Sequence, residues 1–109
     1  MKKRINQIFT GLIAISSLVS VALLWKYNFI LTIVLIILAT LMLLMNKSKQ
    51  EMKTFIFCAF SGAIAEAFAI FFGAWTYGNP SFIGIPIWLI VLWGISSVFM
   101  VRVYLFFKN

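Results

Sequence analysis

The segment at residues 61–75, SGAIAEAFAIFFGAW, is largely apolar and holds one acidic residue, Glu66. A charged side chain at the centre of a bilayer costs about 2.5–3.5 kcal/mol on insertion scales, and such residues usually handle protons, ions or ligands. Glu66 is therefore the candidate catalytic residue of this chain, as an acid or a proton carrier. A structural interpretation stays open, in which a neutral Glu66 hydrogen-bonds a serine and fixes the packing of helices.

The residues that share a helix face with Glu66 are small. At 100° per residue, glycines and alanines fall on the side of the glutamate, and phenylalanines fall on the opposite side. Because small residues let helices approach closely in membranes, Glu66 is expected to face the interior of a bundle. The residues assigned to helix packing are Gly62, Ala63, Ala69 and Gly73.

Hydroxyl and aromatic side chains on other segments are the expected partners of Glu66. Glu66 precedes Trp75 by nine residues, which places it roughly 13 Å below the outer end of a helix over 54–75. Serines and one tryptophan of neighbouring segments lie at that depth, and further aromatic residues form an uncharged rim at the interface. The candidate ligand-binding residues are Tyr77, Trp88, Trp93, Ser96, Ser97 and Ser17.

Four apolar segments must position these side chains. Each is close to the ~20 residues that cross ~30 Å of hydrocarbon as a helix. Helices are expected because an open strand would leave backbone groups unpaired in lipid. We predict an all-α, polytopic membrane protein, with one four-helix transmembrane domain over residues 1–109 and helices at about 8–25, 29–45, 54–75 and 85–107.

Composition and charge place this bundle in a membrane. Hydrophobic residues make up 64% of the chain and charged residues 10%, whereas soluble domains carry about 25% charged residues. Eight of the nine basic residues lie on one side of the four spans, and Lys26 lies on the other. The positive-inside rule then predicts that both termini are cytoplasmic. The membrane itself is expected to be the inner membrane of a prokaryote. Arg102, inside the last span, is expected to extend toward the headgroups.

Several classes of site are not expected. The chain has no histidine and one cysteine, Cys58, so neither a disulfide within the chain nor a His/Cys zinc site is predicted. No phosphate-binding glycine loop is present, and we expect no cofactor. The basic residues do not form a stripe of the kind that binds nucleic acid. The expected partners are membrane lipids, a lipidic ligand and further copies of the chain.

The order of residues from Glu66 to Trp93 is E-x6-G-x-W-x-Y-x2-P-x5-P-x-W-x4-W. It resembles small uncharacterised bacterial membrane proteins that have a similar glutamate-to-tryptophan signature. It is more distantly similar to the membrane-embedded carotenoid-biosynthesis hydratases, with the likeness confined to residues 62 to about 100. The resemblance implies an isoprenoid-like ligand, with Glu66, Tyr77 and Trp93 at its site.

Three interpretations of function stay open. The first is a bundle that binds or acts on a lipidic molecule through Glu66. The second is a proton-coupled exporter similar to the small multidrug-resistance transporters, which would be oligomeric because four short helices enclose little aqueous volume. The third is an accessory subunit of a larger membrane complex.

Overall fold

The structure is a computed structural model that describes residues 2–78, 80 and 84–108. Its helices follow the four apolar segments, and each is long and apolar enough to cross a membrane. The described residues thus give an all-α fold, as predicted. The helices are α1 (Lys2–Leu24), α2 (Asn28–Asn46), α3 (Lys49–Phe71) and α4 (Trp88–Lys108).

The start of α3 differs from the prediction. It begins at Lys49 rather than at residue 54, so only Lys47 and Ser48 separate it from α2. The Ser48 side chain accepts a hydrogen bond from the Glu51 backbone N–H at 3.2 Å, which satisfies a free donor of the first turn. Residues 46–53, which the predicted helix bounds left between two helices, are therefore mostly helical.

The end of α3 also differs, because the helix stops at Phe71 rather than at Trp75. Gly73 has a φ of +84°, a left-handed conformation that side chains disfavour. Its N–H donates to the Ile70 carbonyl, and the Ala74 N–H donates to the Ala69 carbonyl. These two bonds form a Schellman motif, which terminates a helix. Correspondingly, α4 begins at Trp88, three residues later than predicted.

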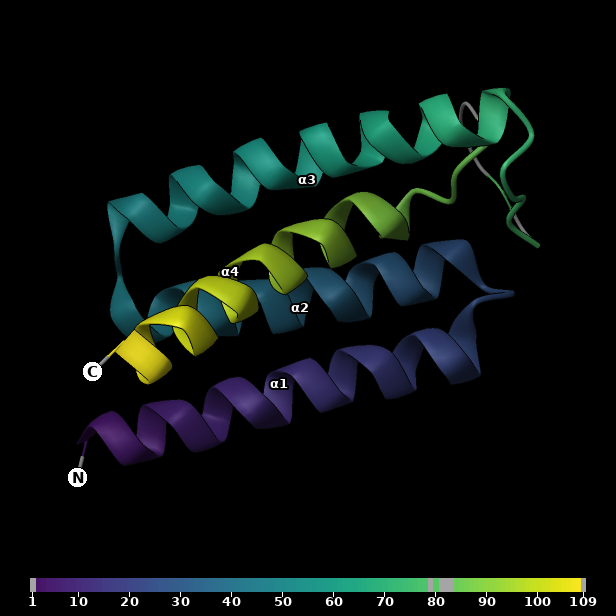
Figure 1. Cartoon of the computed structure of the whole chain (residues 1–109). Coiled ribbons are helices and arrows are strands. Elements are labelled where there is room, and N and C mark those ends of the chain that lie inside the picture. Colours follow the sequence, from purple (N-terminus) through teal and green to yellow (C-terminus); the bar gives the residue numbers. More distant parts are fainter. Residues whose placement is uncertain (1, 79, 81–83, 109) are drawn as a thin grey trace.

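The helices lie side by side along the length of the molecule (Figure 1). Both termini and the α2–α3 turn lie at one end, which we call the termini end. The α1–α2 turn and the segment between α3 and α4 lie at the opposite end, which we call the loop end. Helix α4 contacts all three other helices, whereas α3 packs mainly against α4.

Large apolar side chains cover much of the outside of the bundle. The fully buried ones include Leu31, Leu35 and Val98, from α2 and α4. On α3, by contrast, Phe57 and Phe71 are 73% and 83% exposed. Water disfavours so much exposed apolar surface and lipid does not, so the four helices indicate a multi-pass membrane protein.

Two glycines let α3 and α4 approach each other closely. A Cβ atom built on Gly62 of α3 would lie within 3.0 Å of the Trp93 ring of α4. A Cβ built on Gly94 of α4 would lie within 3.0 Å of the Phe55 ring of α3. Each aromatic ring therefore lies on the bare backbone of the opposite helix, so the packing of α3 on α4 depends on both glycines.

Candidate functional site

Glu66 is joined to Tyr77 at the loop end. The Tyr77 hydroxyl donates a hydrogen bond to Glu66 Oε2 at 2.7 Å, and both residues are half-buried. Because α3 ends at Phe71, Glu66 lies about 7.5 Å from the end of its helix. The predicted depth of roughly 13 Å is wrong for this reason. Tyr77 belongs to the segment between α3 and α4, which brings it back to the glutamate.

Tyr77 keeps its proton at every ordinary pH. Burial raises the pKa of its phenol, and the hydrogen bond to the Glu66 carboxylate and the charge of that carboxylate raise it further. The hydroxyl is therefore the donor of the pair, and Glu66 is the acceptor. The glutamate fixes the orientation of the tyrosine hydroxyl.

Trp88 connects Tyr77 to the helices. The two rings meet edge to face, with centroids 6.3 Å apart and an interplanar angle of 88°. Trp88 is buried, and its indole Nε1 donates to the Asn28 side-chain oxygen at 3.1 Å. Residues from the starts of α2 and α4 and from the α3–α4 segment thus hold one aromatic cluster at the loop end.

A cavity of about 460 Å³ lies beside this cluster. We call it the outer cavity; its volume is in the range of about 300–1,000 Å³ that is typical of small-molecule sites. None of the described side chains that line it carries a charge, and among these the Tyr77 hydroxyl also contacts Glu66. The lining residues are Val21, Ala22, Trp25, Tyr77, Gly78, Pro86 and Trp88.

Two of the three serines that were expected to accompany Glu66 hydrogen-bond carbonyls of their own helices. Ser17 is buried and donates to the Ile13 carbonyl at 2.8 Å, and Ser97 donates to the Gly94 carbonyl at 2.7 Å. Ser96 is exposed and lines a separate groove between α1 and α4. A serine hydroxyl within a helix often bonds the carbonyl one turn earlier, and this local bond uses its donor.

Trp93 and the small residues of α3 take part in helix packing rather than in contacts with Glu66, with Gly73 as the exception. Trp93 lies on Gly62, one turn before Glu66 along α3. Gly62 and Ala63 are buried, and Ala69 is half-buried. Gly73 does not pack helices, contrary to the prediction, because it lies beyond α3 in the motif that ends the helix, with nothing within 4 Å of a Cβ built on it.

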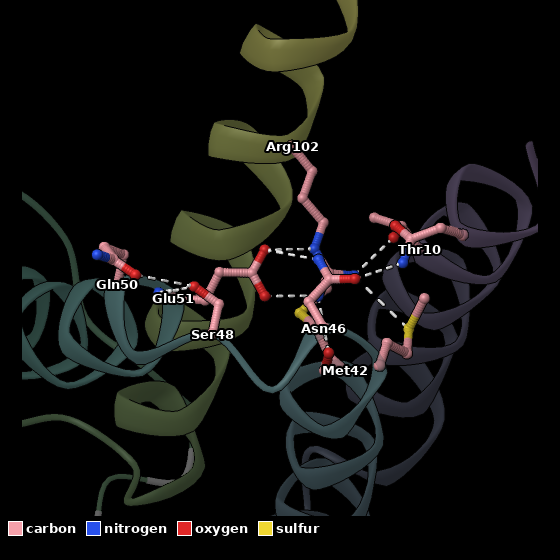
Figure 2. A network of polar contacts seen from close by, with 9 residues as sticks. Thr10, Met42, Asn46, Ser48, Gln50, Glu51 and Arg102 are labelled. Carbon is pink, nitrogen blue, oxygen red and sulfur yellow. Dashed lines mark hydrogen bonds and ion pairs between the residues drawn. The ribbon is translucent and has the colours of Figure 1, made fainter. Parts of the chain in front are cut away.

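A second group of polar side chains, which we call the Arg102 network, lies at the termini end (Figure 2). Arg102 of α4 donates to both carboxylate oxygens of Glu51 of α3, at 2.8 and 2.9 Å. It also donates to the Thr10 hydroxyl of α1 and to the Met42 carbonyl of α2, both at 2.7 Å. One guanidinium group thus binds residues of all three other helices.

Two asparagines extend the Arg102 network. The Asn46 side-chain amide donates to Glu51 Oε2 at 3.1 Å, and Asn6 donates to the Asn46 side-chain oxygen at 2.6 Å. The side chains of Arg102 and Glu51 are only 8% and 11% exposed. Among the described residues, every buried side-chain nitrogen and oxygen has a hydrogen-bond partner. The network is therefore closed and satisfied.

The expectation that Arg102 extends to the headgroups is wrong. Because α3 begins early, Glu51 lies in its first turn and faces Arg102 across the bundle. The signal in the sequence is Ser48-x-x-Glu51, the spacing of a capping box. It predicts a helix start at this point, although here the Glu51 carboxylate bonds Arg102.

Comparison with known proteins identifies one family. A family model described as "Protein of unknown function (DUF2878)" matches residues 10–106, which include Glu66, Tyr77, Glu51 and Arg102. No curated protein and no solved structure matches at a significant level. The match covers most of the chain and part of every helix. The chain therefore belongs to the DUF2878 family of proteins of unknown function.

Proposed function

We propose that this protein spans the inner membrane of a prokaryote four times, with both termini in the cytoplasm. Four apolar helices and an outer surface rich in exposed apolar side chains support the insertion. Eight of the nine basic residues belong to segments at the termini end or near it, whereas Lys26 lies in the α1–α2 turn. The positive-inside rule assigns the basic end to the cytoplasm, so the loop end faces outward.

In this orientation the outer cavity binds a small, apolar, lipid-like molecule. The observation that carries the proposal is the double role of Tyr77, which lines the cavity and donates to Glu66. An uncharged lining with aromatic side chains suits an apolar ligand better than an ion. The distant similarity of the glutamate-to-tryptophan pattern to carotenoid-biosynthesis hydratases favours an isoprenoid-like molecule.

Within this site Tyr77 contacts the ligand and Glu66 acts through Tyr77. The lining of the cavity includes Tyr77 but not Glu66. The tyrosine hydroxyl donates to the carboxylate and is also hydrogen-bonded by the Trp75 side chain, and its oxygen has a further lone pair that accepts a hydrogen bond from a ligand hydroxyl. Glu66 is then a positioning residue that holds the tyrosine in one rotamer.

Native mass spectrometry of the purified protein with farnesol, an isoprenoid alcohol, tests the proposal. We expect the wild type to retain one farnesol, and Tyr77→Phe to weaken retention about fivefold or more, because one hydrogen bond is lost. Ala22→Trp should abolish retention, since Ala22 is exposed at the bundle surface and lines the cavity, which the indole would fill. Glu66→Gln should have a smaller effect than Tyr77→Phe, because an amide oxygen still accepts the bond.

Tyr104→Phe is the matched control, since it removes the same hydroxyl from an exposed tyrosine of α4. It should bind farnesol as the wild type does. Absence of bound farnesol in the wild type, or equal binding by Ala22→Trp, would show that the outer cavity is not the site.

A further inference from the structure

A second cleft of about 380 Å³ lies at the termini end, where α2 meets α3. We call it the basic cleft, and it combines two kinds of side chain. Three lysines belong to it, and all three are exposed. Its other lining residues are mostly apolar, and two of these, Leu44 and Met52, are 57% and 46% exposed. The lysines are Lys47, Lys49 and Lys53.

The charges of these lysines are not neutralised by the acidic residues of the chain, of which there are two. Glu51 is the nearer one in sequence, but its carboxylate points into the bundle and accepts from Arg102 and Asn46 (Figure 2). Glu66 is bonded to Tyr77 near the loop end. The Arg102 network thus removes from the cleft the one carboxylate that lies close to it in the sequence.

Hydrogen bonds fix the backbone of the turn beside the basic cleft. Lys47 ends α2 in a left-handed conformation, with φ 48° and ψ 38°, and its N–H donates to the Leu43 carbonyl. Ser48 then caps α3, and Asn46 is hydrogen-bonded to Glu51 across the turn. Lys47 thus lies in the two-residue turn, Lys49 and Lys53 follow it in the first turns of α3, and hydrogen bonds hold this turn in place.

We propose that the basic cleft binds one anionic phospholipid. The phosphate lies among the lysine ammonium groups, and an acyl chain lies over Leu44 and Met52. Clusters of basic residues at the cytoplasmic ends of transmembrane helices attract anionic headgroups, and the exposed apolar side chains favour a lipid over a soluble anion. This inference goes beyond the proposed function, because the outer cavity lies at the other end of the bundle.

Lipid titration followed by native mass spectrometry tests this site. The probes are dioleoyl phosphatidylglycerol, dioleoyl phosphatidylcholine with the same chains, and inorganic phosphate. We expect phosphatidylglycerol to bind at least about tenfold more tightly than phosphatidylcholine. The triple variant Lys47→Gln/Lys49→Gln/Lys53→Gln should weaken phosphatidylglycerol binding roughly fivefold for each lysine removed. Higher salt should reduce the difference between the two lipids.

The control is Lys3→Gln/Arg4→Gln/Lys108→Gln, which removes the same charge from the same end of the bundle. It should keep nearly the affinity of the wild type, and helical circular dichroism should show that both triple variants are folded. Equal losses in the two variants would mean diffuse attraction without a site. Equal affinity for the two lipids, or phosphate binding as strong as lipid binding, would also overturn the proposal.

Discussion

The two acidic residues of this chain lie in the same helix, yet their surroundings differ in every respect. Glu51 is held by a bidentate arginine and an asparagine in a network that reaches all four helices. Glu66 is half-buried and bonds one tyrosine of a connecting segment, beside a cavity. The first carboxylate is enclosed by the fold, and the second is bonded to a tyrosine that lines a cavity.

This difference helps to distinguish a polar group that stabilises the fold from one that is available to a ligand. A buried, fully satisfied network can fix how helices associate, but it leaves no donor or acceptor for a ligand. The Arg102 guanidinium illustrates this, because its donors are used by protein atoms on three helices. The Glu66–Tyr77 pair has fewer partners and adjoins empty space. We therefore assign packing to Glu51, and we propose ligand contact only for Tyr77, which Glu66 positions.

The largest expected difference in stability is between a variant that breaks the Arg102–Glu51 ion pair and one that alters the Glu66–Tyr77 hydrogen bond. Arg102→Met leaves the buried Glu51 without its cation, and losing one partner of a buried ion pair costs about 3–5 kcal/mol. Glu66→Gln keeps an acceptor for Tyr77 and should cost under about 1 kcal/mol. Unfolding of the purified proteins in mixed detergent, followed by circular dichroism, measures both values. The assignment is wrong if the two variants lose similar stability.

The double variant Arg102→Met/Glu51→Met is the control for that experiment. Because it removes both charges together, no uncompensated ion stays in the bundle. It should be more stable than Arg102→Met alone.

The next largest effect is expected at the contact between α3 and α4, which lies between Glu51 and Glu66 along α3. Gly62→Ala places a methyl group against the Trp93 ring, and this overpacking should cost about 1–3 kcal/mol. Gly11→Ala is the matched change in α1, where nothing lies within 4 Å of a Cβ. It should stabilise the protein by about 0.5–1 kcal/mol, because alanine is the better helix former. The same detergent unfolding assay measures both changes in stability, a loss for Gly62→Ala and a gain for Gly11→Ala.

The smallest expected effect concerns the ionisation of Tyr77. The pKa of this phenol lies above its ordinary value of 10.0, first through burial and then through Glu66. The folded state thus holds the proton more tightly than the unfolded chain, so this contribution to stability is present below pH 10 and declines as the pH rises above it. In Glu66→Gln the midpoint of the Tyr77 titration should move down toward 10, because burial still raises the pKa but the carboxylate no longer does.

The ultraviolet absorbance of tyrosinate measures this midpoint. Subtracting the titration of Tyr77→Phe isolates Tyr77 from the two other tyrosines of the chain. An unchanged Tyr77 midpoint in Glu66→Gln would contradict the bond between the two side chains.

The sequence predicts the four helices well because hydrophobic length is a strong signal. It predicts the ends of α3 poorly, since apolarity continues past Phe71 to Trp75 while the backbone turns at Gly73. The left-handed conformation of Gly73 and the two Schellman hydrogen bonds, from the Gly73 and Ala74 N–H groups, end the helix there. At the other end, Ser48 starts the helix inside a stretch of polar residues.

The partners of the charged residues were harder to predict. Tyr77 bonds Glu66 from outside α3, so this contact depends on the path of the chain after Phe71 rather than on spacing along a helix. Arg102 and Glu51 are far apart in the sequence, and their meeting depends on how α3 packs on α4. Glu66 itself was identifiable at once, because an acidic residue among apolar ones is conspicuous.

The position of Arg102 in the last helix has a consequence for biogenesis. During translation Thr10, Met42 and Glu51 leave the ribosome before their common donor does. Until α4 is synthesised, Glu51 lacks the guanidinium that it binds in the folded protein, and α3 lacks the helix against which it mainly packs. Closure of the Arg102 network therefore waits for α4, and a chain interrupted before Arg102 would leave the Glu51 carboxylate without its cation.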